Sequence, residues 1–133
     1  MPAEPVWLSL DAVVAINREE AARTGEQHEL IDRAALEIAA RRPWNVWVYF
    51  MDRDFATLAM SLLVALAGAR AFASGNEATA YRAAVALLAA NGFTLDLAGN
   101  RRAEEQIHEY FCGRLSQSGV REWFRMWMSP VER

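Results

Sequence analysis

The chain has no lysine, so all 14 of its basic residues are arginines. This excludes a phosphate-loop lysine and a Schiff-base lysine, because both kinds of site need a primary amine. Cys112 is the single cysteine, which excludes an intrachain disulfide and gives no sign of an oxidising compartment. With a formal net charge of -3, the chain lacks the basic excess typical of nucleic-acid-binding proteins. We therefore expect no nucleic-acid partner.

Hydrophobic runs long enough for a membrane span are also missing. The longest run, Phe55 to Ala69, has about 15 residues, whereas roughly 20 are needed to cross a bilayer. Residues 1–5 hold a glutamate and two prolines instead of the basic and apolar regions of a secretion signal. The sequence thus predicts a cytoplasmic protein of bacterial type with no membrane partner. With 133 residues and no linker or repeat, we expect a single domain over residues 1–133.

Turn and capping residues recur at helix-length intervals and predict a mainly α fold, a bundle of roughly six to seven helices. Ser9 or Asp11 is expected to cap a first helix that Gly25 ends, and Asp32 to cap a second. Because it is apolar on nearly every side, the helix from Asp54 to Ala69 is expected to be central. Further helices are predicted from Glu77 to Ala90, from Arg101 to Leu115, and after a cap at Ser118.

Two segments have less regular patterns. Phe93, Leu95 and Leu97 alternate with polar residues, which is typical of a short strand, and residues 6–8 are its obvious partner. The aromatic-rich segment from Trp44 to Phe50 is compatible with a short helix or an extended flap, and the pattern leaves both open.

The segment joining the two most apolar predicted helices is the most informative part of the chain. It reads Ala-Arg-Ala-Phe-Ala-Ser-Gly-Asn-Glu-Ala-Thr-Ala over residues 69–80. Through Phe72, Gly75 and Asn76 it resembles the signature of the Fic/Doc family, His-x-Phe-x-Asp/Glu-Gly/Ala-Asn-Gly/Lys-Arg. A Leu-Ser-Leu-Asp entry, a glycine-bearing loop after the first helix and the turn at residues 91–93 also look like death-on-curing toxins. The resemblance covers roughly residues 7–111.

The resemblance implies a compact helical fold that binds a nucleoside triphosphate with magnesium and transfers part of it to a hydroxyl group of a target protein. It also implies a toxin of a toxin-antitoxin pair, which accepts the folded tail of its antitoxin in a hydrophobic groove. Gly75, Asn76 and the start of the next helix would cradle phosphate, since backbone N–H groups and the helix dipole favour anions there.

Four positions differ from the family signature, and the residues found there cannot perform the family's chemistry. Arg70 stands in place of the histidine, and a guanidinium that stays protonated cannot act as a general base. Ser74 replaces the magnesium-binding acid, and a neutral hydroxyl is a poor ligand for a hard cation. Glu77 and Ala78 replace the basic end of the signature, so a carboxylate would face the phosphate. The sequence therefore predicts a degenerate site without a metal, impaired in the family's mechanism.

The leading hypothesis is a pseudoenzyme of the Doc type that acts through protein binding. Its partner would be an antitoxin-like peptide or an active relative. The candidate contact residues are aromatic: Trp44, Trp47, Trp123 and Trp127. Burial in the core is the alternative for these side chains, because spacing by one helical turn serves both purposes. A homo-oligomer is compatible with this hypothesis.

The alternative hypothesis is an active or altered transferase, moving a phosphoryl or nucleotidyl group from a nucleotide to a protein hydroxyl. Arg70, with Arg82, would then hold the phosphates of ATP without magnesium, since an arginine fork binds anions directly. A local ion pair between Arg70 and Glu77 is the competing interpretation. No zinc site is expected around Glu104, His108 and Cys112, because His28 is the only other imidazole.

Overall fold

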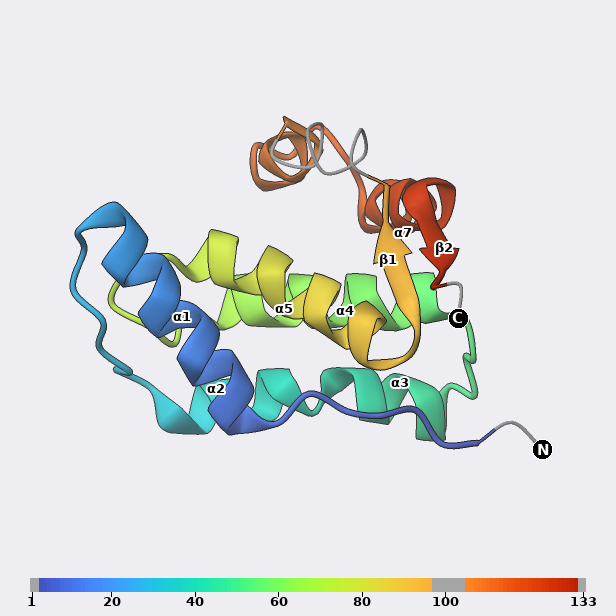
Figure 1. Ribbon diagram of the computed structural model, residues 1–133, viewed down its shortest axis with the longest axis horizontal. Helices are drawn as coiled ribbons and strands as arrows, with labels where there is room; N and C mark the ends of the chain where they lie inside the picture. Colours follow the sequence, from blue (N-terminus) through green and yellow to red (C-terminus); the bar gives the residue numbers. More distant parts are fainter. Residues whose placement is uncertain (1–2, 97–104, 132–133) are drawn as a thin grey trace.

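The computed structural model describes residues 3–96 and 105–131 and is mainly α-helical with a small antiparallel sheet, as predicted (Figure 1). A helical segment over residues 105–111 lies between β1 and α7 in the chain. The other elements, in order, are α1 (Leu10–Thr24), α2 (Arg33–Ala40), α3 (Arg42–Tyr49), α4 (Phe55–Ala69), α5 (Asn76–Ala90), β1 (Phe93–Leu95), α7 (Gln117–Trp127) and β2 (Met128–Pro130).

The helices begin and end mostly where the capping residues predict. The Ser9 hydroxyl accepts a hydrogen bond from the backbone N–H of the third residue on, and the Asp32 carboxylate caps α2 in the same manner. The Asp54 carboxylate caps α4 by accepting from the backbone N–H of the second residue on. Gly25 ends α1 with a φ of 75°, a left-handed conformation that glycine adopts without steric cost. Trp44 to Phe50, which the sequence left open, lies in α3 and its C-cap.

The expected cap of the last helix was wrong by two residues. Ser116, with extended backbone, accepts a hydrogen bond from Gly119 N at 3.1 Å, so α7 begins at Gln117. Ser118 lies inside the first turn, where its hydroxyl is 3.2 Å from that of Ser116. Two serines spaced two residues apart are equally good caps by residue type, and the backbone conformation selects the first.

The predicted partner of the short strand was also wrong. β1 pairs antiparallel with β2, in the register Phe93 with Pro130 and Leu95 with Met128. The N-terminal segment is held instead by one side chain: Val6 N donates to Asn91 Oδ1 at 2.7 Å, and Asn91 Nδ2 donates to Val6 O at 2.9 Å. The Asn91 amide thus takes the place of a strand partner for Val6. Leu97, the last residue of the predicted strand, lies outside the described residues.

The helices form layers around α4, the predicted central helix (Figure 1). α4 and α5 run antiparallel side by side in the middle layer, and α4 also contacts α2 and α3 on one side and α7 on the other. α1 crosses the end of this layer and packs on α5. No helix among the described residues is long and apolar enough to cross a membrane.

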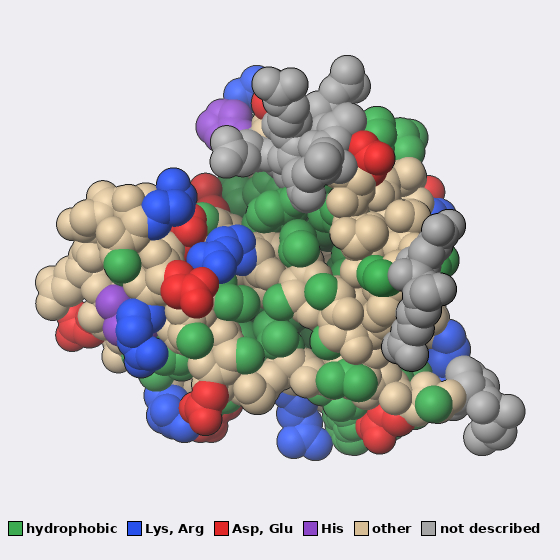
Figure 2. Space-filling model, viewed as in Figure 1, with side chains coloured by type: hydrophobic (Ala, Val, Ile, Leu, Met, Phe, Trp, Pro, Cys, Tyr) green, Lys and Arg blue, Asp and Glu red, His purple; other side chains and the backbone are tan. Residues whose placement is uncertain are grey.

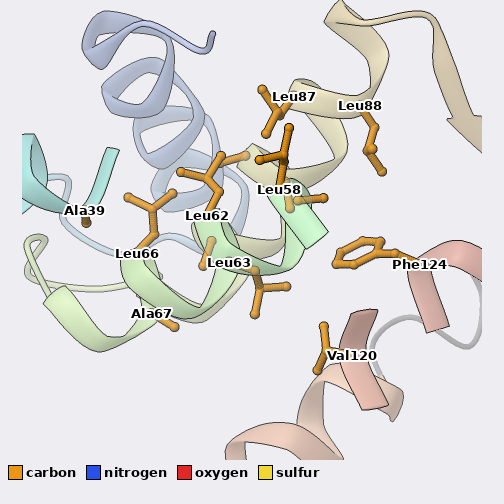
Figure 3. Packing of buried hydrophobic residues seen from close by; sticks show 14 of the residues in the cluster. Ala39, Leu58, Leu62, Leu63, Leu66, Ala67, Leu87, Leu88, Val120 and Phe124 are labelled. Atoms are coloured by element: carbon orange, nitrogen blue, oxygen red, sulfur yellow. The ribbon is translucent and has the colours of Figure 1, made fainter. Parts of the chain in front are cut away.

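The core lies between these layers and consists largely of leucine and alanine (Figure 3). Leu58, Leu62 and Leu63 of α4 are at most 1% exposed, and Phe124 of α7 closes the core from the other side. Full burial of such side chains contributes about 1.5–3 kcal/mol each. Alanines on both α4 and α5 are also buried, which lets the two helices approach closely. This rigid pair of helices positions the loop between them.

Candidate functional site

The loop over residues 70–75, called the signature loop below, joins α4 to α5. Arg70 ends α4 in a left-handed conformation with φ 47° and ψ 46°, which costs a non-glycine residue about 1 kcal/mol. Gly75 precedes α5 with a φ of 72°. Asn76 holds the loop in this shape: its Oδ1 accepts from Phe72 N at 3.0 Å and its Nδ2 donates to Phe72 O at 2.8 Å. Asn76, one of the residues that match the Fic/Doc signature, therefore fixes the backbone of Phe72, another of them.

The signature loop is also fastened to the connection between α1 and α2. Leu30 and Phe72 form an isolated antiparallel bridge, and Ala73 N donates to Glu29 O at 2.9 Å. The Ser74 hydroxyl donates to Gln27 O at 3.1 Å. At the position where the Fic/Doc signature has its magnesium-binding acid, the Ser74 hydroxyl is directed at the protein's own backbone. The polar groups of the loop are thus largely satisfied within the chain.

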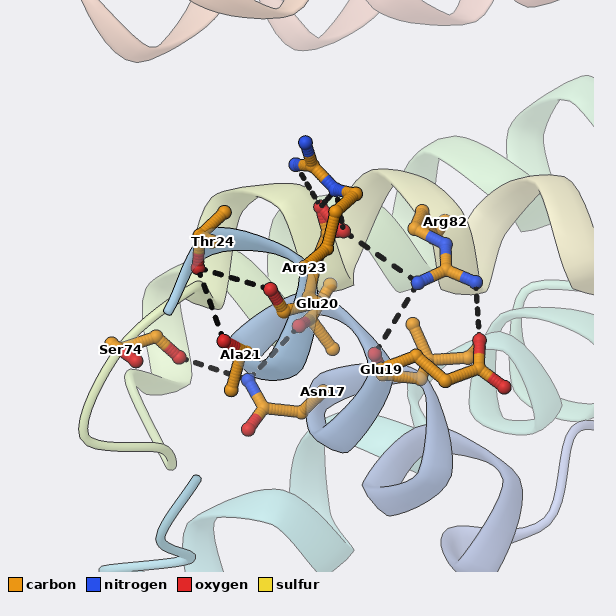
Figure 4. A network of polar contacts seen from close by, with 10 residues as sticks. Asn17, Glu19, Glu20, Ala21, Arg23, Thr24, Ser74 and Arg82 are labelled. Carbon is orange, nitrogen blue, oxygen red and sulfur yellow. Dashed lines mark hydrogen bonds and ion pairs between the residues drawn. The ribbon is translucent and has the colours of Figure 1, made fainter. Parts of the chain in front are cut away.

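Asn17 of α1 is the buried centre of this arrangement (Figure 4). Its Nδ2 donates to Ser74 O at 2.8 Å and to Thr79 Oγ1 at 3.0 Å. Its Oδ1 lies 2.8 Å from His28 Nδ1, so this ring nitrogen must carry the proton. Sequence reasoning missed the role of Asn17 and of His28. The available signal was an asparagine within the apolar stripe of the first helix.

Arg70 is exposed, and no carboxylate in the described part of the chain pairs with it. The anticipated ion pair with Glu77 is therefore not seen there. Both side chains instead line a cavity of about 550 Å³ between α4, the first turn of α5 and residues 110–117. Glu77 lies in that first turn, where a carboxylate interacts favourably with the positive end of the helix dipole.

The site does not fit the magnesium ion of the Fic/Doc family. Ser74 donates its hydroxyl proton to a carbonyl, and no group of three or more histidine, cysteine or acidic residues among the described residues is arranged to hold a metal. His108 Nε2 and Cys112 Sγ lie 3.4 Å apart on one helix face, and Glu104, the third member of that pattern, lies outside the described residues.

A second cavity of about 690 Å³ lies between α1, α5 and the helical segment at residues 105–111. On its polar wall Arg82 Nη2 lies 2.7 Å from Glu19 Oε2 and Arg82 Nη1 lies 3.6 Å from Glu20 Oε2 (Figure 4). Arg82 was expected near the signature loop; it is held by these carboxylates of α1 because they face it directly. Tyr81 and Phe111 lie on the apolar part of the lining. In Figure 2 hydrophobic side chains line α5, with charged side chains over α1 beside them.

Glu20 is the buried member of this polar wall, 5% exposed. The hydrogen bond from Arg23 is the main cause that lowers the pKa of Glu20, and the charges of Arg23 and Arg82 add to it against the opposing effect of burial. The carboxylate therefore stays ionised and paired. This wall holds α1 against α5 and offers a charge-balanced surface to the cavity.

The four candidate tryptophans separate into two pairs. Trp123 is buried in the core, and Trp127 is half-buried against it, so α7 is clamped by these rings. Trp44 and Trp47 are half-buried on α3, and each ring makes a cation-π contact, with Arg41 and Arg53 respectively. The α3 surface is defined here by the aromatic, apolar and basic side chains of α3 and its flanks: Arg41, Arg42, Trp44, Trp47, Tyr49, Phe50, Met51 and Arg53.

No known family model matches the chain, and no curated protein matches it. The Fic/Doc resemblance therefore remains a prediction that rests on the sequence signature.

Proposed function

We propose that the protein is a Doc-like scaffold that lacks transferase activity by the Fic/Doc mechanism and acts by binding a protein partner, an antitoxin-like peptide or an active relative. The observation that carries the proposal is the state of the signature loop. Its shape is maintained by Asn76 and Asn17, while the two positions on which the chemistry depends, Arg70 and Ser74, hold groups unable to perform it.

Loss of the general base alone accounts for most of the expected defect. Arg70 remains protonated, and removal of one positioned base typically lowers a rate on the order of 10²- to 10⁴-fold. Ser74 adds to this loss, because its hydroxyl is donated to Gln27 O and offers no charge to a cation. Glu77 would repel a phosphate at the start of α5. The three differences act on separate steps of the family mechanism, so their effects compound.

Protein binding is favoured by what the scaffold leaves exposed. The buried polar side-chain atoms of the described residues all have partners, and Ser74 and Asn76 of the signature loop and the start of α5 bond to the chain's own backbone. The α3 surface differs, since large apolar side chains there face solvent. Exposed apolar groups gathered on one element are typical of an interaction site.

The test is a transfer assay paired with in-cell crosslinking. The purified chain is incubated with ATP labelled on the α or γ phosphate, magnesium and bacterial extract, and we expect no label in protein. The matched comparison is Arg70→His with Ser74→Asp, which restores the base and the acid of the signature. Crosslinking in the expressing cell should capture one discrete protein partner. Protein labelled by the native chain, or capture of no partner, would contradict the proposal.

One observation favours a second candidate, a protein that binds a nucleotide without magnesium. Arg70 has no carboxylate partner among the described residues and faces the 550 Å³ cavity, so its guanidinium is available to an anion. Thermal unfolding with ATP, with and without magnesium, tests this candidate. A ligand at 100 times its dissociation constant adds about 2.7 kcal/mol to stability. A rise in melting temperature that Arg70→Gln abolishes would support the candidate, and no rise in either condition would exclude it.

A further inference from the structure

Among the described residues, the one run of consecutive exposed large apolar side chains lies at the end of α3. Tyr49, Phe50 and Met51 are consecutive and are 71%, 66% and 70% exposed. Such exposure of three large apolar residues in a row is unfavourable for an isolated surface. We propose that the α3 surface binds an acidic peptide segment of a partner protein that carries apolar anchor residues. This inference rests on the proposed binding function and names its surface and the chemistry of its partner.

Three arginines lie over the aromatic rings of this surface. The guanidinium carbon of Arg41 is 4.5 Å from the ring centre of Trp44, that of Arg42 is 5.4 Å from Phe50, and that of Arg53 is 4.0 Å from Trp47. These are the only three cation-π contacts seen in the described part of the chain. An arginine stacked on a ring keeps its N–H groups directed outward at the ring's edge, where they can bind a carboxylate in two-point fashion.

None of the three arginines has a carboxylate partner among the described residues. Of the four acidic side chains around α3, two form ion pairs with other arginines, and two accept hydrogen bonds from neutral N–H groups and keep their charge. Glu37 pairs with Arg33 and Asp54 with Arg125; Asp52 accepts from the backbone N–H of Asp54, and Glu4 accepts from Trp7 Nε1. The three arginines outnumber the two carboxylates that have no arginine partner, Asp52 and Glu4, so this surface keeps an excess of positive charge on a chain of net charge -3 and is complementary to an acidic segment.

A groove beside α3 provides a place for an apolar anchor. It has a volume of about 420 Å³ and lies between α3 and α4, with Arg42 and Phe50 at one side and Val46, Met60 and Val64 among its apolar lining. Its polar lining includes one carboxylate, Asp52. Because Arg42 and Phe50 belong to both the groove and the stacked pairs, an anchor in the groove would place a neighbouring carboxylate within reach of a guanidinium. The apolar and the charged contact are thus adjacent.

An acidic peptide fits better than the other candidate occupants. A second copy of the chain, seated face to face across a two-fold axis, would bring the arginines of both copies together. Single-stranded nucleic acid also uses arginine and aromatic rings. Three arginines offer it few phosphate contacts, however, and affinity for nucleic acid depends mainly on such contacts.

The experiment measures binding of short fluorescent peptides by anisotropy. The probe is an amphipathic peptide in which aspartate and glutamate alternate with leucine and phenylalanine. Two matched peptides carry glutamine or lysine at the acidic positions, and a single-stranded DNA is the fourth probe. We expect the acidic peptide to bind best and to weaken as salt is added, because the surface charges are screened. The variant Arg41→Gln/Arg42→Gln/Arg53→Gln should lower its affinity at least about tenfold.

The control variant Arg18→Gln/Arg114→Gln/Arg121→Gln removes the same charge from other faces and should bind as the native chain does. Phe50→Ser should also weaken binding, with the fold checked by circular dichroism. The inference is overturned if the acidic peptide does not bind, if the glutamine peptide or the DNA binds at least as tightly, or if both triple variants behave alike. The crosslinking assay of the proposed function is scored separately. If the α3 triple variant still binds the captured partner, the α3 surface is excluded as the binding site, while the proposed binding function stands.

Discussion

The signature loop and the α3 surface use their polar side chains differently. In the loop, the side-chain amides of Asn76 and Asn17 form hydrogen bonds to the backbone of Phe72 and Ser74. On the α3 surface, three arginine guanidinium groups lie over aromatic rings. Apart from the Arg70 side chain, the first region bonds its polar groups within the molecule, whereas the second leaves its guanidinium groups to solvent or a partner. The loop that resembles a catalytic site is thus built as a structural element. The segment without a recognisable motif has the exposed chemistry of a binding site.

The strongest way to break this contrast is to remove its buried centre. Asn17→Ala deletes hydrogen bonds to Ser74 O, Thr79 Oγ1 and His28, and leaves buried groups without partners at about 1–3 kcal/mol each. We expect a loss of about 3 kcal/mol in the free energy of unfolding. The measurement is urea unfolding followed by circular dichroism. The matched control is Asn45→Ala on α3, which should change stability by less than about 0.5 kcal/mol; equal effects would contradict the contrast.

Two glycines, one at the end of the signature loop and one in α4 before it, should respond to the same substitution with opposite sign. Gly75→Ala places a side chain at a φ of 72°, with its Cβ 3.5 Å from Asn17 Nδ2, and should cost about 1–2 kcal/mol. Gly68→Ala lies inside α4 with open space around it and should stabilise by about 0.5–1 kcal/mol. Melting temperatures of the two variants test the pair. A stabilising Gly75→Ala would show that the loop is not held in its left-handed turn.

Acid should act on the internally paired region through Glu20. Because its pKa is lowered in the folded state from an ordinary value of 4.5, mainly by the hydrogen bond from Arg23, its contribution is fully present above about pH 4.5. It is lost as the pH falls through the lowered value. Glu20→Gln should therefore show a shallower decline of stability below pH 4.5 than the native chain. The measurement is the unfolding free energy across this pH range for the native chain, for Glu20→Gln and for the control Glu19→Gln. If Glu20 contributed nothing, the curves of the native chain and of Glu20→Gln would be parallel.

The smallest effect on stability is expected on the α3 surface. Phe50→Ser and Tyr49→Ser replace exposed rings and should change the unfolding free energy by less than about 0.5 kcal/mol. The same substitutions are expected to matter for binding. If either substitution lowered the unfolding free energy by about 2 kcal/mol or more, the ring would contribute to the folded core and would no longer be a candidate contact for a partner.

Much of the fold was predictable because its determinants are local. Ser9, Gly25, Asp32 and Asp54 act on residues a few positions away, and the apolar character of α4 is visible along its own length. The strand pairing was not, because Asn91 diverts the N-terminal segment by a contact between residues 85 positions apart. No periodic pattern carries that information.

The site was predictable in outline and not in its interactions. The position of the signature loop between the two most apolar helices was predictable, and Arg70 and Ser74 lie in that loop; the roles that the resemblance implies for them remain predictions. Asn17 was not found, since its partners come from three distant segments. The exposure of Tyr49 and Phe50 was likewise missed, because an aromatic residue gives the same sequence signal whether it faces the core or solvent.

The short pairing of β1 with β2 has a consequence for how the molecule assembles. It brings Phe93 next to Pro130 and so closes a long loop of the chain that contains α7. Closing so long a loop costs conformational entropy, and the formation of α7 alone does not offset that cost. We expect α1 to α5 to fold first and α7 to dock last, as one cooperative unit with the strands. Amide hydrogens of α7 and β1 should then exchange together, faster than those of α4.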